Sequence, residues 1–153
     1  MTVGNGIGGL AAVFGGGGFV GRHTVSALAR RGWRVRAAER RPDLTGYLQP
    51  MGVVGQVMPV QANLRYPNSV EAAVQGADVV INTVAIMTSS GAQTLDAVNV
   101  EGARTVARAA RAAGVKRFIH VSAIGADRKS SAGYARSKAA GEAAVLAEFP
   151  DAI

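Results

Sequence analysis

The chain contains no cysteine and only two histidines among its 153 residues. Without thiols it can form no disulfide, thiolate metal site or cysteine nucleophile, and two histidines are too few for a histidine-rich metal centre. Aromatic residues are also scarce, at 5%, whereas 48% of the residues are hydrophobic and 20 are glycine. This composition predicts small and β-branched side chains in the core, as where helices pack closely on a sheet, and it favours an α/β fold.

Long apolar runs are missing as well. No run approaches the roughly 20 residues that a membrane-spanning helix needs, and the first residues lack the basic start of a secretory signal. The sequence therefore predicts no transmembrane segment and a soluble or peripheral protein. A chain of this length is expected to be one globular domain, residues 1–153, that buries roughly 68–70% of its unfolded surface.

Acidic side chains are outnumbered, ten against 17 basic ones, for a net charge of +7. No aromatic platforms for stacking bases are interleaved with the basic residues, so we predict no nucleic-acid partner. The open alternatives are a solvated basic surface, or docking onto an acidic partner or lipid. Seven of the basic residues lie close together in the sequence: Arg22, Arg30, Arg31, Arg34, Arg36, Arg40 and Arg41.

From residue 10 onward, short apolar runs alternate with stretches of helical period. This alternation predicts a doubly wound parallel sheet of the Rossmann type, with strand order 3-2-1-4-5. Pro59 suits the edge position that this order gives the third strand. The predicted strands are residues 10–14, 33–38, 55–62, 79–84 and 116–122, and the predicted helices are 19–31, 68–75, 94–113 and 132–146, with a short helical or irregular segment at 42–49.

Two details of the helices and one of the chain's end can also be predicted. A stripe of Val20, Thr24 and Leu28 is expected to face the sheet, and Asn68 is expected to cap the second helix. Residues 149–153 resemble a turn into a sixth strand. Because dinucleotide domains of this type have six strands, we expect the chain to be truncated there, without a following substrate region.

The segment V-F-G-G-G-G-F-V-G, residues 13–21, predicts a strand, a tight turn and a helix start. Gly15 or Gly16 can adopt the backbone angles of the turn, Gly18 lets the main chain approach a phosphate, and Gly21 lets the helix pack closely on the strand. This turn therefore predicts a site for the diphosphate of a dinucleotide.

The helix that begins with Phe19 and Val20 would offer unpaired N–H groups and a positive dipole end to that anion. Gly4, Gly6 and Gly9 fit the same glycine spacing. No strand precedes them and no helix follows, so we interpret them as a flexible leader.

The second predicted strand leads into Glu39, Arg40 and Arg41. An acidic residue here accepts hydrogen bonds from the adenosine ribose and favours NAD(H), whereas an arginine pairs with the 2′-phosphate of NADP(H). Arg22 at the helix start adds to a positive mouth, so NADP(H) is favoured and NAD(H) is the alternative. The bland interpretation is that Arg40 and Arg41 are simply solvated.

Further candidates follow the next two strands. Asn63 and Leu64 come where an adenine contact is expected, although Asn63 can equally be a turn residue. Val84 and Ala85 follow the fourth strand, where small side chains leave room for a cofactor. Asp78, at the opposite end of that strand, is interpreted as a turn or packing residue.

Tyr134 and Lys138 are four residues apart and therefore share one face of the last predicted helix. A lysine beside a tyrosine favours the phenolate, and its remaining N–H groups can hold the nicotinamide ribose. Ser122 can hydrogen-bond a substrate oxygen or merely cap a loop. Asn99 can orient a water or a backbone carbonyl near the lysine, or be an ordinary polar residue on a partly buried helix.

Together, V-F-G-G-G-G-F-V-G, G-A-D-V-V-I-N-T-V-A, R-F-I-H-V-S-A-I-G-A-D and Y-A-R-S-K-A-A-G-E resemble the extended and atypical short-chain dehydrogenase/reductase superfamily. Within it the chain is most similar to the branch of the nucleotide-binding accessory subunit of respiratory complex I and to NmrA-like proteins. The resemblance implies roles for these residues: the phosphate loop for Gly15, Gly18 and Gly21, the adenosine end for Arg40 or Arg41, the nicotinamide ribose for Lys138 and the catalytic base for Tyr134.

The resemblance has one departure, because Ala123 can align with the catalytic hydroxyl residue of active members. The accessory subunits hold NADPH in a structural role, so the resemblance implies a structural nucleotide, complex I subunits as partners, and a cytoplasmic protein, peripheral at the inner membrane in that role. The alternatives are an active epimerase, dehydratase or hydroxysteroid-type oxidoreductase that uses Tyr134 as acid/base, and a redox-sensing regulator.

Overall fold

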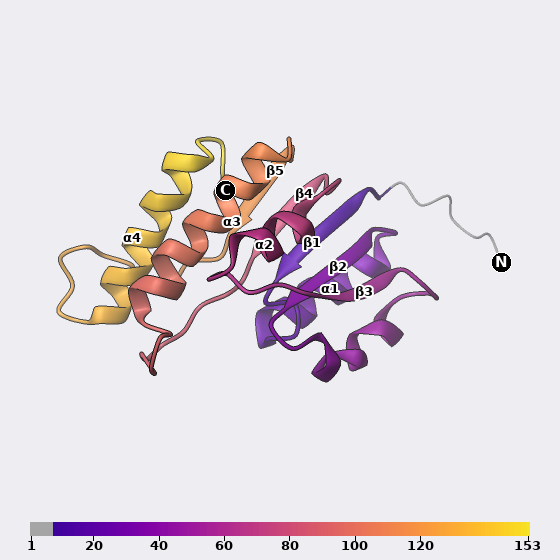
Figure 1. Ribbon diagram of the computed structural model, residues 1–153, viewed down its shortest axis with the longest axis horizontal. Coiled ribbons are helices and arrows are strands. Elements are labelled where there is room, and N and C mark those ends of the chain that lie inside the picture. The colour runs from indigo at the N-terminus through magenta and orange to yellow at the C-terminus, as the bar shows by residue number, and fades with distance from the viewer. Residues whose placement is uncertain (1–7) are drawn as a thin grey trace.

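The computed structural model describes residues 8–153, and its centre is a parallel sheet in the order β3-β2-β1-β4-β5 (Figure 1). This order confirms the predicted doubly wound Rossmann-type arrangement and places Pro59 on the edge strand. The strands are slightly shorter than predicted: β1 (Leu10–Phe14), β2 (Arg34–Glu39), β3 (Val57–Gln61), β4 (Val79–Asn82) and β5 (Arg117–His120).

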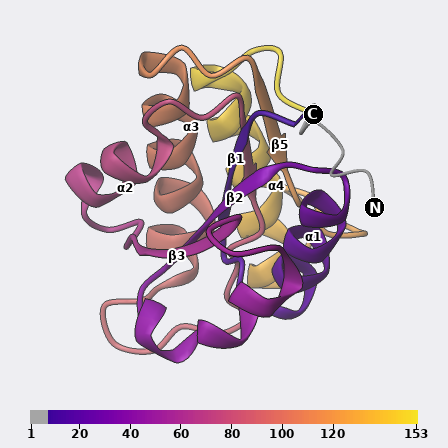
Figure 2. The ribbon, with the colours of Figure 1, turned by 90° about the vertical axis from the view of Figure 1, so that its right-hand side faces the viewer.

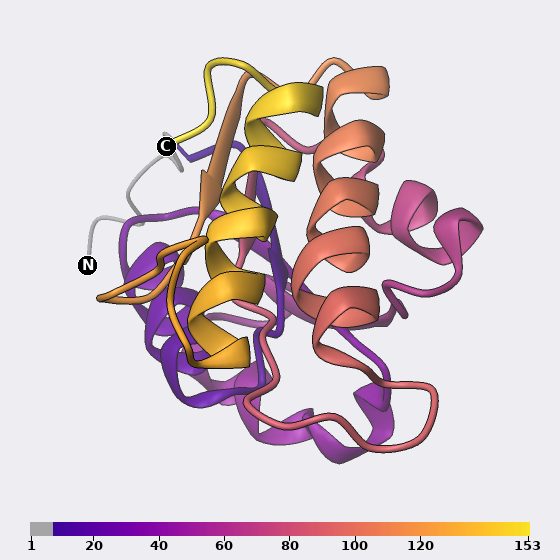
Figure 3. The ribbon, with the colours of Figure 1, turned by 90° about the vertical axis from the view of Figure 1, so that its left-hand side faces the viewer.

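Helices cover both faces of the sheet. The helical elements are α1 (Phe19–Arg30), the 3₁₀ segments η1 (Pro42–Leu44) and η2 (Gly46–Met51), α2 (Pro67–Val74), the π-helical segment η3 (Asp96–Gly102), α3 (Ala103–Ala112) and α4 (Gly133–Glu148). Buried side chains of α1 and η2 pack on one face (Figure 2). Those of α2, α3 and α4 pack on the other, where α3 and α4 lie side by side (Figure 3).

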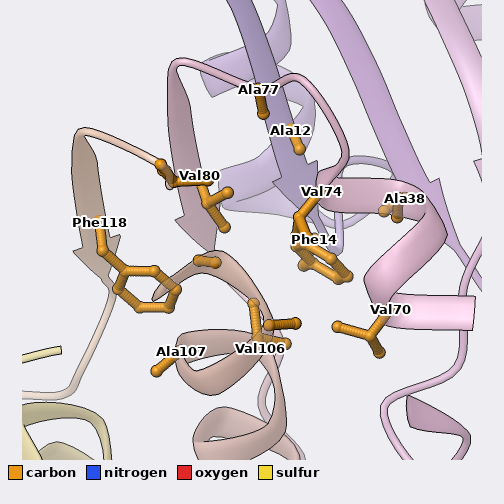
Figure 4. Close-up of a cluster of buried hydrophobic side chains, with 14 of the residues drawn as sticks. Ala12, Phe14, Ala38, Val70, Val74, Ala77, Val80, Val106, Ala107 and Phe118 are labelled. Carbon is orange, nitrogen blue, oxygen red and sulfur yellow. The ribbon is translucent and has the colours of Figure 1, made fainter. Parts of the chain in front are cut away.

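The side-chain alternation along the strands divides the core in two. Phe14, Val80 and Phe118 point into the layer beneath α2 and α3 (Figure 4). Val13 and Val35 belong to the opposite cluster, with α1 and η2. Both faces of the central strands are therefore apolar, which explains why these strands are near-continuous apolar runs in the sequence.

The buried stripe of α1 differs from the prediction. Gly21, Val25 and Ala29 face the sheet, whereas Val20 is 47% exposed and Thr24 is only partly buried. The physical reason is Gly21, because a Cβ at this position would overlap the carbonyl group of Gly15. Close packing of this glycine on the turn sets the rotation of the helix and brings the residues four and eight positions later onto the sheet.

Two further helix predictions were wrong in detail. Asn68 is not a cap: α2 begins at Pro67, whose fixed φ suits a first helical position, and no side chain caps the helix. The predicted helix 94–113 is not uniform, because η3 widens into π-helical geometry before α3 begins. Segments of this kind occur often at functional sites.

The two ends of the described chain extend the sheet. Gly9 is not part of a flexible leader, since its carbonyl accepts a hydrogen bond from the Arg34 N–H at 3.1 Å. Gly4 and Gly6 lie outside the described residues. At the other end, the Ile153 N–H donates to the Phe118 carbonyl at 2.9 Å and the His120 N–H donates to the Ile153 carbonyl at 2.8 Å. Ile153 thus pairs with the edge of β5, as expected for the first residue of a further strand.

Among the helices of residues 8–153, none combines the length and the apolar character that crossing a bilayer requires.

Candidate functional site

A cleft of about 270 Å³ opens at the carboxyl ends of β1, β2 and β4. It lies where the strand order reverses between β1 and β4, which is the place where open α/β sheets bind ligands. Its lining includes the predicted site residues Gly15, Gly18, Arg40, Asn63, Leu64, Val84 and Ala85, together with Ala38, Glu39, Ala62, Arg65, Thr83, Ile86, Gln93 and Val98.

The glycine turn forms one wall of this cleft. Gly15 has a φ of +75°, a conformation that favours glycine, and its N–H donates to the Ala38 carbonyl at 3.0 Å. The Gly18 N–H donates back to the Gly15 carbonyl at 3.0 Å. Between the two residues that the sequence left open for the turn angle, the structure therefore selects Gly15 over Gly16.

Side chains from three other segments hold this turn, and the sequence analysis missed this. The Thr83 hydroxyl donates to the Phe14 carbonyl at 2.7 Å, with the Gly15 carbonyl at 3.1 Å. On the other side, the Glu39 carboxylate accepts a hydrogen bond from the Gly17 N–H. The Tyr47 hydroxyl in η2 donates to the Gly17 carbonyl at 2.6 Å. Both polar groups of Gly17 are therefore held before any ligand binds.

The first turn of α1 is open to an anion. Gly18 is the N-cap and supplies no capping side chain, and the first turn contains no acidic residue. Its N–H groups and positive dipole end therefore fit a diphosphate. Phe19 and Val20 lie outside the cleft lining, and Phe19 packs against the Arg22 guanidinium, 5.3 Å from the ring centre. Their side chains are exposed, so any contact with a ligand would come from their main chain.

The two candidate arginines have different surroundings. Arg41 pairs with Asp43 at 2.8 Å on the surface, outside the cleft lining, and this pairing holds the pKa of the Asp43 carboxyl below its usual value. Arg40 lines the cleft, and none of the salt bridges within residues 8–153 involves it. Arg40 is thus the arginine placed to meet a ligand phosphate.

Asn63 combines the two roles that the sequence left open. Its Oδ1 accepts a hydrogen bond from the Arg65 N–H at 3.0 Å, and its own N–H donates to the Ser69 hydroxyl at 3.0 Å. The residue is therefore a turn residue that also lines the cleft, and its Nδ2 is the group that can face a ligand. Asp78 is a packing residue, because its Oδ2 accepts from the Leu10 N–H at 2.9 Å at the opposite edge of the sheet.

The proposed catalytic residues lie on α4 and after β5. Lys138 is 1% exposed, and its Nζ donates to the Val121 carbonyl at 2.9 Å. Burial lowers the pKa of this ammonium group. Tyr134 is partly buried one turn earlier, outside the cleft lining. Ser122 faces a different cavity, which His120 and residues of the second half of α4 also line.

Asn99 connects the cleft with α4. Its Oδ1 accepts from the Ile86 N–H and its Nδ2 donates to the Ile86 carbonyl, both at 2.9 Å. The same Nδ2 contacts the Ser137 hydroxyl at 3.0 Å, and that hydroxyl donates to the Tyr134 carbonyl at 2.8 Å. The interpretation that Asn99 orients a backbone carbonyl agrees with this network, and the carbonyl is that of Ile86, which lines the cleft.

Within residues 8–153, no three acidic or histidine side chains come together in a way that could hold a metal ion.

Comparison with known proteins agrees with this geometry. A family described as NAD(P)H-binding matches residues 15–149. The ceramide reductase of Caulobacter vibrioides is 39% identical over 145 residues, which are 95% of this chain and 44% of that protein. Subunit 9 of the mitochondrial NADH dehydrogenase (ubiquinone) 1 alpha subcomplex of Rattus norvegicus is 42% identical over 146 residues, 94% of this chain and 38% of that protein.

A solved structure is similar as well. The crystal structure of vestitone reductase from alfalfa superimposes with a TM-score of 0.73 at 25% sequence identity, over 90% of this chain and 51% of that one. The chain thus spans less than half the length of the two curated relatives. What it shares with them is the sheet and the cleft, which lie within the matched residues.

Proposed function

The chain belongs to the NAD(P)H-binding family, and from this premise we propose that its cleft binds NADP(H) in preference to NAD(H). The observation that carries the proposal is the position of Arg40, which lines the cleft, together with the hydrogen bond that Glu39 accepts from Gly17. A carboxylate engaged with the glycine turn is less available to the ribose hydroxyls that favour NAD(H), whereas a guanidinium beside it can pair with a 2′-phosphate.

In this proposal the diphosphate rests on the glycine turn and on the first N–H groups of α1, and the adenosine lies between Arg40 and Asn63. The nicotinamide end extends past Val84 and Ala85 toward Lys138. Only one N–H of the Lys138 ammonium is used by the Val121 carbonyl, which leaves two donors for the nicotinamide ribose. When bound, the cofactor would supply hydride chemistry, and the chain would supply binding and orientation.

We further propose that the nucleotide is structural and that the protein associates with respiratory complex I, where it would lie peripherally at the membrane. Two observations support this role. Ser122 lines a cavity other than the cleft, and Ala123 follows it where a catalytic hydroxyl residue would be expected. A similar subunit of a mitochondrial NADH dehydrogenase supports the choice of partner.

A reductase is the second candidate, with Tyr134 as the acid/base. It is favoured by the spacing of Tyr134 and Lys138 on α4 and by the likeness to a ceramide reductase. The two candidates differ in what they need. The enzyme must oxidise NADPH in the presence of a carbonyl substrate and lose that activity in Tyr134→Phe, whereas the accessory protein must retain complex I subunits when it is captured from solubilised respiratory membranes.

The choice of cofactor can be tested with two arginine variants. We expect calorimetry to show tighter binding of NADPH than of NADH, by about tenfold or more, because a charge-assisted pair with a phosphate contributes about 1.5–3 kcal/mol. Arg40→Ala should remove this difference. Arg41→Ala is the matched control and should keep it, because Arg41 already pairs with Asp43. Equal affinities of the unaltered protein for NADPH and NADH would refute the preference.

A further inference from the structure

Positive charge is unevenly distributed along the chain. Residues 1–70 contain eight arginines and two acidic residues, Glu39 and Asp43, and so carry +6 of the net +7. Both acids are engaged: Glu39 accepts a hydrogen bond from the glycine turn and Asp43 pairs with Arg41. This half of the chain includes α1, β2 and η2, which lie on the side that faces the viewer in Figure 2.

Much of this charge gathers at the amino edge of the sheet, opposite the cleft. Arg30 ends α1 and Arg31 follows it, Arg34 begins β2, and Lys116 and Arg117 stand at the start of β5. All five are exposed. None of the salt bridges within residues 8–153 involves Arg30, Arg31, Arg34 or Arg117, and the acid at this edge, Asp78, lies 3.7 Å from Lys116.

An apolar turn projects beside these arginines. Val53 is 74% exposed and Val54 is fully exposed, in residues 52–56 between η2 and β3. Gln56 holds this turn in place: its Oε1 accepts from the Val53 N–H, and its Nε2 donates to the carbonyls of Ala29 and Trp33 at 2.7 and 3.0 Å. The turn is thus tied to the end of α1, where the arginines are.

We propose that this amino edge, defined here by Arg30, Arg31, Arg34, Val53, Val54, Lys116 and Arg117, docks the protein onto an anionic lipid bilayer. Exposed arginines meet the negative surface potential of such a bilayer, and two adjacent valines at a projecting turn can enter its headgroup layer. The cleft, at the opposite edge of the sheet, then faces the aqueous side and stays accessible to the nucleotide.

Helix capping, a protein partner or a nucleic acid would each account for less of this surface. Arg30 and Arg31 complement the negative end of the α1 dipole, but Arg34 and Arg117 begin strands and have no such role. A protein partner would be expected to find aromatic anchors and a broad complementary surface. Here the exposed apolar groups are two β-branched side chains at a convex tip. A nucleic acid would use the charge but not the valines.

The experiment is sedimentation of the protein with vesicles of phosphatidylcholine and phosphatidylglycerol in a 3:1 ratio. We expect binding to these vesicles, little binding to pure phosphatidylcholine, and loss of binding as NaCl is raised from about 0.1 to 0.5 M. Arg30→Gln combined with Arg34→Gln should weaken binding about 20-fold, at about fivefold per arginine. The matched control, Arg128→Gln with Lys129→Gln, removes two exposed charges from the loop between β5 and α4 and should change little.

A second pair of variants tests the apolar turn. Val54→Ser should weaken vesicle binding by about threefold. Ile124→Ser removes an equally exposed apolar side chain from the loop after β5 and should not. Unchanged binding of Val54→Ser, or equal weakening by the two arginine and lysine pairs, would overturn the proposal in favour of general attraction to a polyanion.

The single tryptophan reports the docking face directly. Trp33 precedes Arg34 and lines a cavity with Lys116 and Arg117, so it lies at the amino edge. Vesicles that carry a nitroxide on a fraction of the phosphatidylcholine headgroups should quench its fluorescence on binding. Binding without quenching would place another face on the membrane, and absence of binding would refute the proposal. Neither result depends on NADPH, so both are separable from failure of the proposed function.

Discussion

At the residue scale, polar groups buried at the carboxyl end of β5 are the most unusual feature. Lys138 is almost fully buried, with its ammonium group on the Val121 carbonyl. The His120 Nδ1 lies 3.3 Å from the Asn82 Nδ2, while its Nε2 and the Ser122 hydroxyl are buried with no hydrogen-bond partner among the described residues. Burial, with the Lys138 charge nearby, lowers the pKa of His120 to about 4, although Glu142 acts in the opposite direction.

This shift predicts a pH-dependent stability. Above pH 6.5 the imidazole is neutral in both the folded and the unfolded chain. As the pH falls toward 4, the unfolded chain takes up a proton that folded His120 does not, so the free energy of unfolding decreases. We expect a loss of about 1–2 kcal/mol between pH 6.5 and 5, after allowance for partial solvent access, measured by urea unfolding.

His120→Asn should flatten the curve in this range, and His23→Asn, on the exposed face of α1, is the control. Because the carboxyl groups titrate mainly below pH 5, they contribute little to the comparison. The same slope in the unaltered protein and in His120→Asn would contradict the assignment.

At the scale of elements, the position of the glycine turn depends on contacts between segments that are distant in the sequence. Thr83 after β4 holds it on one side, and Tyr47 in η2 with Glu39 at the end of β2 holds it on the other. Pro42 begins η1 and Leu48 anchors η2 in the core, which brings the Tyr47 hydroxyl over the turn. A turn held in this way loses less conformational freedom when a diphosphate binds.

Tyr47→Phe should therefore weaken NADPH binding about three- to tenfold, the value of one hydrogen bond of about 0.5–1.5 kcal/mol. Calorimetry measures this directly. The melting temperature should change little, because Tyr47 is 49% exposed. Tyr66→Phe, at an exposed tyrosine outside the cleft lining, is the control. If the two variants bind NADPH with equal affinity, the hydroxyl of Tyr47 does not position the turn.

At the scale of the whole molecule, the sheet has two edges of opposite character. The carboxyl edge carries the cleft, the glycine turn and the open helix start. The amino edge carries exposed arginines and the Val53–Val54 turn. A parallel sheet separates them by the length of its strands, so binding at one edge leaves the other accessible.

A structural role for the nucleotide predicts a gain in stability. Ligand that binds only the folded chain, at a concentration 100-fold above its dissociation constant, adds about 2.7 kcal/mol to the free energy of unfolding. For a chain of this size we expect the melting temperature to rise by about 5–10 °C with NADPH, followed by circular dichroism. NADH at the same concentration should raise it less, and Arg40→Ala should remove the difference. No rise with either nucleotide would contradict binding at the cleft.

Much of the fold and part of the site could be predicted from local patterns. The alternation of apolar runs with helical periods determined the parallel sheet and its strand order, because each signal lies within a few residues. The positions of Gly15, Gly18 and Gly21 determined the turn, since only glycine allows these backbone angles and close approaches.

Only the tertiary structure decided the rest. It set the buried face of α1, paired Arg41 with Asp43 while Arg40 lines the cleft, and directed Ser122 toward a separate cavity. It also brought Tyr47 onto Gly17, 30 residues away. The physical reason is that these outcomes depend on packing between segments distant along the chain, which the spacing of residue types does not encode.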